Sequence, residues 1–258
     1  MALMDINSPQ FHAYAWVASD VSSNEEATTY SNNDRMLQRY ALGVLYFSTN
    51  GVNWSMSDGW LTSEDECTWY GISGCQDANT DKIISIELKG NELVGSIPPE
   101  LFEFIPTLVV LNLATNVLSG PIPKEIGMLS NINILELAEN DLTSIPSEMG
   151  NLNTIDHLFL QSNNFGEQSM PDEVCQLRSA GSLTLLWADC KGNGSLQCSV
   201  DCCTTCFESS MNGDNNVFEE DTGSSTSTSD TVTYTPAITH ADTEGDMLAK
   251  LKKMAPGE

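Results

Sequence analysis

The sequence predicts an α/β solenoid: a right-handed superhelix of stacked coils in which each coil adds one short strand to a parallel sheet on the concave face. Three observations predict this fold. A motif of alternating leucines recurs at intervals of 23 to 25 residues, an Asn follows each motif at a fixed spacing, and all eight cysteines flank the repeated region. Flanking caps are expected because the first and last coils of a solenoid each leave an apolar face uncovered.

The repeated region has about 4.5 units between residues 83 and 188. Asn91, Asn116, Asn140 and Asn163 mark the same position in four units, at intervals of 25, 24 and 23 residues. The L-x-L segment before each Asn predicts a short strand with one buried face, because side chains alternate along a strand. We expect the four Asn side chains to form a ladder at the corners of the coils. There an amide can satisfy backbone donors and acceptors that leave the sheet.

A G-x-I-P segment ends the first two units, at Gly95 and Gly120. It is expected to break the strand, because Gly permits a turn and Pro fixes φ without needing a donor. The third unit lacks the Gly before Ile145, and the fourth carries the insertion Gly166–Ser169. We expect both departures to distort the convex turns and to leave the strand positions unchanged.

These repeats resemble the plant-type leucine-rich-repeat family, whose consensus is L-x-x-L-x-L-x-x-N-x-L-x-G-x-I-P. Receptor-kinase ectodomains and the polygalacturonase-inhibiting proteins of plant cell walls belong to it. The segment Asn50–Cys75, with its paired cysteines and its tryptophans, is similar to the N-terminal cap of that family. Three further segments resemble uncharacterised repeat proteins of diatom algae: Ser8–Gln10, Arg39–Leu42 and Cys202–Cys206. The resemblance covers roughly residues 8–207 and implies an extracellular, receptor-like protein.

The flanks of the repeats predict helices and caps. Pro9–Ala18 and Asp34–Phe47 are expected helices, and the apolar stripe of the second is expected to pack on the first coil. The predicted boundaries are 1–50 for an N-terminal helical segment, 51–82 for the N-terminal cap, 83–188 for the repeats, 189–207 for a cysteine-rich C-terminal cap and 208–258 for an acidic, Ser/Thr-rich disordered tail.

The cysteines predict disulfides in both caps, because an even count that flanks a cysteine-free core is typical of oxidising compartments. Cys67–Cys75 is the favoured pair, whereas the six C-terminal cysteines allow many pairings; only a Cys202–Cys203 bond is disfavoured by geometry. The alternative is a zinc ion held by C-terminal thiolates. We expect disulfides, with no metal and no cofactor. The expected disulfide cysteines are Cys67, Cys75, Cys175, Cys190, Cys198, Cys202, Cys203 and Cys206.

The charge balance excludes several kinds of partner. The net charge is −26, from 36 acidic and 10 basic side chains, which argues against nucleic acid and against anionic membrane surfaces. No apolar run approaches the roughly twenty residues of a membrane span, and Met1–Gln10 lacks the features of a secretory signal. Because the cysteines predict an extracellular or cell-surface location, we expect an export signal or membrane anchor upstream. Asn53 and Asn193 are candidate glycosylation sites, one in each cap region.

No catalytic constellation is found. The three histidines, His12, His157 and His240, lie in different regions, and the sequence carries no nucleophile-elbow, phosphate-loop or dinucleotide motif. Glu87 and Glu136 fall on strands two coils apart, about 10 Å by strand spacing, which is too loosely specified for glycosidase chemistry. The sequence therefore predicts a protein that is not an enzyme.

The concave face is the candidate binding surface, because strand alternation turns the middle residue of each L-x-L segment outward. Phe159 and Trp187 are expected side by side, where aromatic rings can anchor peptides or sugars. The alternative is that the C-terminal cap folds over them. The candidate ligand-binding residues are Glu87, Asn112, Glu136, His157, Phe159, Gln161 and Trp187.

We expect a non-catalytic recognition domain that binds a protein, peptide or glycan at the cell surface or in the extracellular matrix. The alternative is a structural cell-wall or surface-coat protein without a discrete ligand. A single saturable ligand favours the first reading, and retention in the wall without one favours the second.

Overall fold

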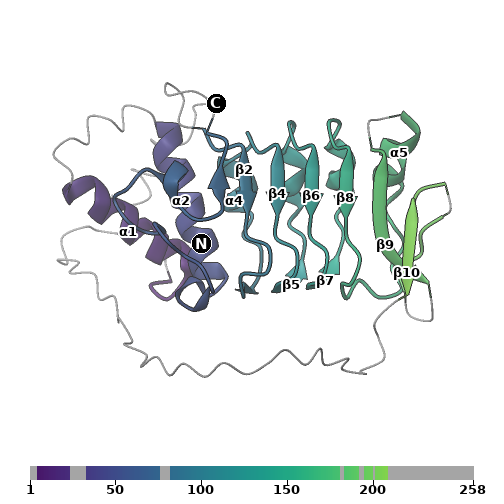
Figure 1. Cartoon of the computed structure of the whole chain (residues 1–258), viewed down its shortest axis with the longest axis horizontal. Helices are drawn as coiled ribbons and strands as arrows, with labels where there is room; N and C mark the ends of the chain where they lie inside the picture. Colours follow the sequence, from purple (N-terminus) through teal and green to yellow (C-terminus); the bar gives the residue numbers. More distant parts are fainter. Residues whose placement is uncertain are drawn as a thin grey trace.

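A computed structural model describes residues 5–23, 33–75, 82–180, 183–191, 195–199 and 201–208. Asn193, His240 and nearly all of the predicted tail lie outside the described residues. The described part is a solenoid with helices at its N-terminal end and a row of strands running to its C-terminal end (Figure 1). This arrangement confirms the predicted leucine-rich-repeat fold and its cysteine-rich cap.

The main sheet has seven strands in the order β1-β2-β4-β6-β8-β9-β10. All neighbouring strands pair in parallel except β1, which pairs with β2 in the antiparallel direction. The register places the middle leucine of one coil against that of the next, as in the pairing of Leu111 with Leu135. The strands are β1 (Ile72–Ser73), β2 (Ser85–Glu87), β4 (Val110–Asn112), β6 (Ile134–Glu136), β8 (His157–Phe159), β9 (Leu185–Lys191) and β10 (Thr205–Glu208).

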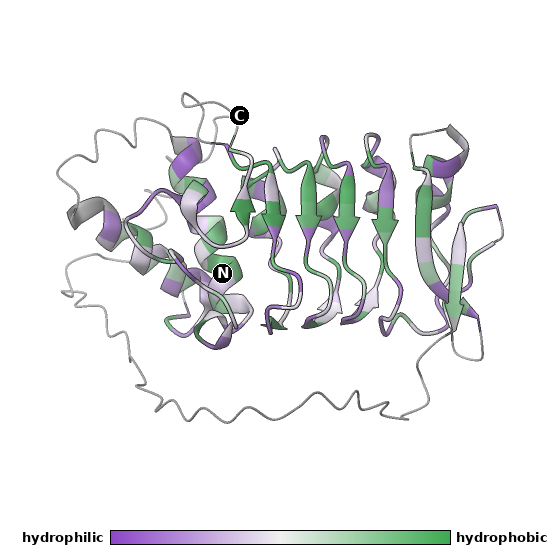
Figure 2. Ribbon diagram, viewed as in Figure 1, coloured by the Kyte–Doolittle hydropathy of each residue, from purple (hydrophilic) through white to green (hydrophobic). Residues whose placement is uncertain are grey.

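The core lies between the two long sides of the coils. Strand leucines such as Leu111, Leu135 and Leu158 are fully buried and belong to one continuous apolar cluster. Figure 2 shows the apolar residues gathered along the strands of the main sheet. Because each coil contacts only its neighbours, this burial holds the stack together one interface at a time.

The opposite side of the solenoid has a second, three-stranded sheet and short helices. The G-x-I-P segments were expected only to break the strand, but in the first two coils Gly95 and Gly120 belong to strands of this sheet. The hydrophobic periodicity of the sequence did not reveal these strands, because their outward-facing residues include both apolar and polar side chains. The elements are β3 (Val94–Gly95), β5 (Val117–Pro121), β7 (Asp141–Ser144), α4 (Glu100–Phe104), η5 (Lys124–Met128), η6 (Ser147–Asn151) and α5 (Asp172–Ala180).

The asparagine ladder connects consecutive coils. Asn140 Oδ1 accepts from Leu118 N at 2.9 Å, and its Nδ2 donates to Leu113 O at 2.9 Å and to Leu137 O at 3.3 Å. Asn116 and Asn163 each bond a backbone amide and a carbonyl of the preceding coil in the same way. The amide thus replaces the sheet hydrogen bonds that the chain loses where it turns.

The insertion in the fourth coil is anchored to the third. Gln168 Nε2 donates to Thr143 O at 2.9 Å and to Phe165 O at 2.7 Å. Ser169 forms an isolated parallel bridge with Gln197 of the C-terminal cap. The insertion therefore alters the convex turn while β8 keeps its register with β6, as the sequence predicts.

The N-terminal cap is a helical hairpin followed by a disulfide-bonded loop. Helix α1 (Pro9–Ser23) extends five residues beyond the predicted end at Ala18, and α2 is Asn33–Ser48. The loop contains η3 (Gly51–Asn53) and η4 (Glu66–Thr68), followed by β1. α2 packs against α4 of the first coil and covers its apolar end (Figure 1).

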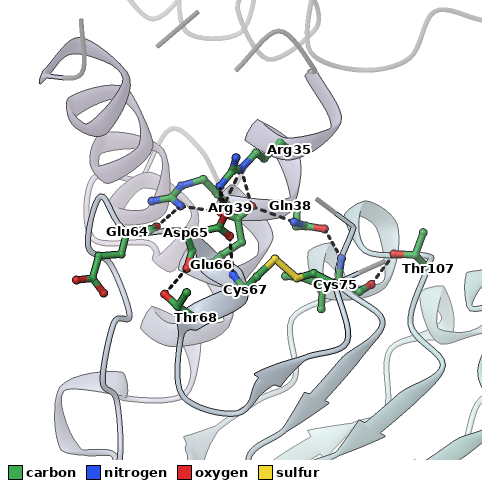
Figure 3. The surroundings of a disulfide bond; sticks show 11 residues. Arg35, Gln38, Arg39, Glu64, Asp65, Glu66, Cys67, Thr68, Cys75 and Thr107 are labelled. Atoms are coloured by element: carbon green, nitrogen blue, oxygen red, sulfur yellow. Dashed lines mark hydrogen bonds and ion pairs between the residues drawn. A yellow bond between two sulfur atoms is a disulfide. The ribbon is translucent and has the colours of Figure 1, made fainter. Parts of the chain in front are cut away.

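A buried ion cluster joins the helices to the cap loop (Figure 3). Glu66 is fully buried and accepts from Arg39 Nη1 at 2.8 Å, from Arg35 Nη2 at 3.0 Å and from Gln38 Nε2 at 3.0 Å. The Arg39 guanidinium also pairs with Asp20 at 3.1 Å. Gln38 Oε1 accepts from Ile83 N at 3.0 Å, so the same cluster reaches the first repeat.

All eight cysteines are paired. Cys67 is joined to Cys75, the pair that the sequence favoured, and Cys202 and Cys203 bond to separate partners. The C-terminal pairs, which the sequence left open, are Cys175–Cys202, Cys190–Cys206 and Cys198–Cys203. The first of these ties α5 to the cap, and the second ties β9 to β10.

Candidate functional site

The outward face of the main sheet, which we call the sheet face, presents three columns of side chains, one residue from each coil. The parallel registers place Glu87, Asn112, Glu136, Phe159 and Trp187 side by side in the central column. One flanking column is Ser85, Val110, Ile134, His157 and Leu185. The other column is largely buried: it follows the ends of β2, β4, β6 and β8 and continues within β9, with Lys89, Ala114, Ala138, Gln161 and Asp189.

The first three residues of the central column are polar and are bonded to each other or to neighbouring side chains. Asn112 Nδ2 donates to Glu136 Oε2 at 2.8 Å, and Ser85 Oγ donates to Glu87 Oε1 at 2.9 Å. Asn112 therefore stands between the two glutamates in the central column.

The C-terminal half of the sheet face carries an aromatic patch of Phe159, Trp187 and Phe207. The rings of Phe159 and Trp187 meet edge to face, with centroids 4.8 Å apart, and Trp187 and Phe207 are 5.6 Å apart. All three side chains are half-buried. His157 adjoins the patch at 5.9 Å from Phe159.

The C-terminal cap adds one strand, β10, to the main sheet beside the aromatic patch. β10 pairs in parallel with β9, with Thr205 opposite Trp187 and Phe207 opposite Asp189. Phe207 of the cap packs beside Trp187, which keeps an exposed portion, so the cap covers Trp187 in part. β10 was not predicted, because its Thr205–Glu208 segment lacks the leucine pattern of the other strands.

Asp189, at this end of the sheet face, was not among the ligand-binding residues predicted from the sequence. It is 4% exposed, and its Oδ2 accepts from Asn163 N at 2.9 Å. In the two preceding coils the Asn of the ladder donates its backbone N–H to a carbonyl of the following coil. Here β9 continues straight instead of turning, and the Asp189 carboxylate supplies the missing acceptor.

The other candidate groups are widely separated. His12 lies on α1 and contacts Phe47, whereas His157 lies on β8 beside Asp156 at 3.6 Å. Among the described residues, the one group with metal-ligand spacing is Cys190, Cys198 and Cys203. Each of these is disulfide-bonded, so the zinc alternative has no free thiolate. Asn53 is exposed on the cap loop.

The convex side carries a separate acidic group. Burial, followed by repulsion from Glu100 and Glu125, raises the pKa of Glu103 above its usual range. Burial also raises the pKa of Tyr40, which packs edge to face on Phe104. These groups lie behind the sheet and are not part of the sheet face.

Known proteins with similar sequences are plant receptors. A segment of 96 residues is 36% identical to phytosulfokine receptor 1 of Arabidopsis thaliana, which is 36% of this chain and 9% of that protein. Another match, to the LRR receptor-like serine/threonine-protein kinase GSO2 of the same plant, is 41% identical over 109 residues, 41% of this chain and 8% of that protein. The chain thus spans less than a tenth of either relative. The matching regions are leucine-rich-repeat ectodomains, a non-catalytic binding fold, although the whole relatives include kinases.

Among solved structures, the ectodomain of the receptor kinase SOBIR1 from Arabidopsis thaliana is similar, with a TM-score of 0.46 and 21% identity. The likeness covers 58% of this chain and 77% of that one. No family model matches the chain. No described helix is both long and apolar enough to cross a membrane.

Proposed function

We propose that this chain, which is similar to the leucine-rich-repeat ectodomains of plant receptors, is a recognition domain that binds a protein, peptide or glycan through its sheet face. The observation that carries the proposal is the apolar and aromatic surface on that face. Val110, Ile134 and Leu185 are half-buried in one column, beside the aromatic patch. Partly exposed apolar side chains on a rigid strand surface are typical of binding sites.

The frame of this face favours binding with little rearrangement. The asparagine ladder holds consecutive coils, and disulfides tie the C-terminal cap to β9 and α5. A preformed surface loses little conformational entropy on association, so more of the contact energy contributes to affinity. A structural role in a cell wall or surface coat remains the second candidate, supported by the acidic composition alone.

A binding selection with matched variants tests the proposal. We expect peptide or glycan libraries presented to the oxidised domain to yield a saturable ligand of micromolar or tighter affinity. Ile134→Arg, on the sheet face, should lower the affinity for that ligand at least tenfold, because the substitution places a long cationic side chain over the apolar column. Val117→Arg, on exposed β5 of the second sheet, is the matched control and should leave the affinity unchanged. Equal effects of the two variants, or retention in cell-wall material without any saturable ligand, would favour the structural role.

We also propose that the domain functions outside the cytosol, at the cell surface or in the extracellular matrix. All eight cysteines are paired, and such disulfides persist in oxidising compartments. Non-reducing mass spectrometry of protein from its native source should find four disulfides with these partners, and a glycan on Asn53 or Asn193 would support the same location. Eight free thiols would contradict it.

A further inference from the structure

Asp189 carries a carboxylate oxygen for which the described residues supply no partner. Its Oδ2 is bonded to Asn163 N, whereas Oδ1 is buried without a hydrogen bond. A buried carboxylate oxygen without a donor is costly to the fold. A bound ion or ligand is one explanation for a buried polar group that the protein leaves unsatisfied.

The neighbours of Asp189 supply rings and a second acceptor. Trp187 precedes it by two residues on the same face of β9, and Phe207 is its partner across to β10. Gln161 occupies the matching position of the preceding coil, and its Oε1 is likewise buried without a partner. The position therefore combines two unpaired acceptors with the aromatic patch, in which the Nε1–H of Trp187 is a buried donor without a partner.

The charged side chains around this position are mostly acidic. Glu136 pairs across to Phe159 in the central column, and Asp156 lies directly before β8. Lys191, at the exposed end of β9, makes no ion pair with Asp189 in the described structure. His157, beside Asp156, adds positive charge only when it is protonated.

We propose that the aromatic patch and Asp189 form a subsite for a cationic group of the ligand, a guanidinium or an alkylated ammonium. Such a cation would lie against the exposed parts of the rings, whose π-faces attract it, within the field of the buried carboxylate. The subsite rests on the proposed function, because it assigns a ligand chemistry to one end of the sheet face. The cation belongs either to an Arg or Lys side chain of a peptide or to a free amine.

Three probes separate the effect of the ligand's charge from that of its shape, and separate a peptide side chain from a free amine as the source of the cation. They are the peptide acetyl-Gly-Arg-Gly-amide, its citrulline counterpart, which has the same shape without the charge, and agmatine as a free guanidine. Binding is followed by calorimetry and by the fluorescence of Trp187, which is half-buried while the other four tryptophans are buried. We expect the arginine peptide to saturate, and the citrulline peptide to bind at least tenfold more weakly. Agmatine as tight as the arginine peptide would assign the subsite to free amines, and weaker agmatine to a peptide side chain.

Asp189→Asn is the decisive variant, because the amide oxygen can still accept from Asn163 N while the charge is lost. We expect it to weaken arginine-peptide binding at least tenfold without loss of the folded state, whose thermal unfolding is measured in parallel. Asp141→Asn, an exposed site on β7, is the matched control and should bind as the parent does. Trp187→Leu should also weaken binding.

Equal binding of the arginine and citrulline peptides, no saturable binding of either cation, or unchanged binding by folded Asp189→Asn would overturn the subsite. If a selected ligand depends on Ile134 while the cations do not bind, the subsite alone fails. If the cations bind through Asp189 while no ligand depends on the rest of the sheet face, the broader function fails.

Discussion

Replacing Glu66 by Ala is expected to lower the free energy of unfolding by about 3–5 kcal/mol, the range found when one partner of a buried ion pair is removed. Glu66 is fully buried and accepts hydrogen bonds from Arg35, Gln38 and Arg39. Without it, the guanidinium of Arg39, which is 1% exposed, loses its shortest ionic contact. The partners that remain, the Asp20 carboxylate and the carbonyls of Thr62 and Glu64, offset only part of that loss.

Urea unfolding followed by tryptophan fluorescence measures this effect in the cap itself. The Arg39 guanidinium lies 5.1 Å from the ring of Trp16 and 5.0 Å from that of Trp69, so both tryptophans report on the cluster. Glu64→Ala, two residues away and exposed, is the matched control and should change stability by less than about 0.5 kcal/mol. A similar small loss for Glu66→Ala would show that the cluster does not hold the helices to the cap loop.

Asn140→Ala is expected to cost about 3 kcal/mol, because it removes several hydrogen bonds within the stack at once. The backbone N–H of Leu118 and the carbonyl of Leu113 would lose their side-chain partner in a buried environment. Each buried group left unsatisfied costs about 1–3 kcal/mol, and an Ala side chain offers no replacement. The loss should appear as a lower urea midpoint for the repeats.

Asn151→Ala provides the comparison for the ladder, since the same change is made at an exposed position of η6. It should leave the midpoint nearly unchanged. If both variants unfold at the same urea concentration as the parent, the ladder hydrogen bonds contribute no net stability and water replaces them.

The strands and the ladder were predictable from the sequence because they are periodic. Leu111 and Leu135 occupy the same position in successive repeats. A residue between two buried leucines of a strand faces outward, because successive side chains point to opposite faces of the sheet. The same rule placed Phe159 and Trp187 in adjacent coils, where their rings now meet. Periodicity works here because every coil repeats the same local solution.

The remaining features depend on single contacts between distant segments. The cluster of Asp20, Arg39 and Glu66 draws one residue from each of three segments, and no spacing relates them. Phe207 reaches the aromatic patch only because Cys206 is bonded to Cys190 and β10 pairs with β9. Such pairings are chosen by three-dimensional packing, so the sequence alone left them open.

The sheet face as a ligand surface is tested most directly by hydroxyl-radical footprinting of the selected ligand complex, read by mass spectrometry. We predict that ligand lowers the oxidation of Phe159 and Trp187 on the sheet face and leaves Met128, which is 50% exposed on η5, unchanged. Protection of Met128 with no change at Phe159 and Trp187 would contradict this function and would place recognition on the convex side.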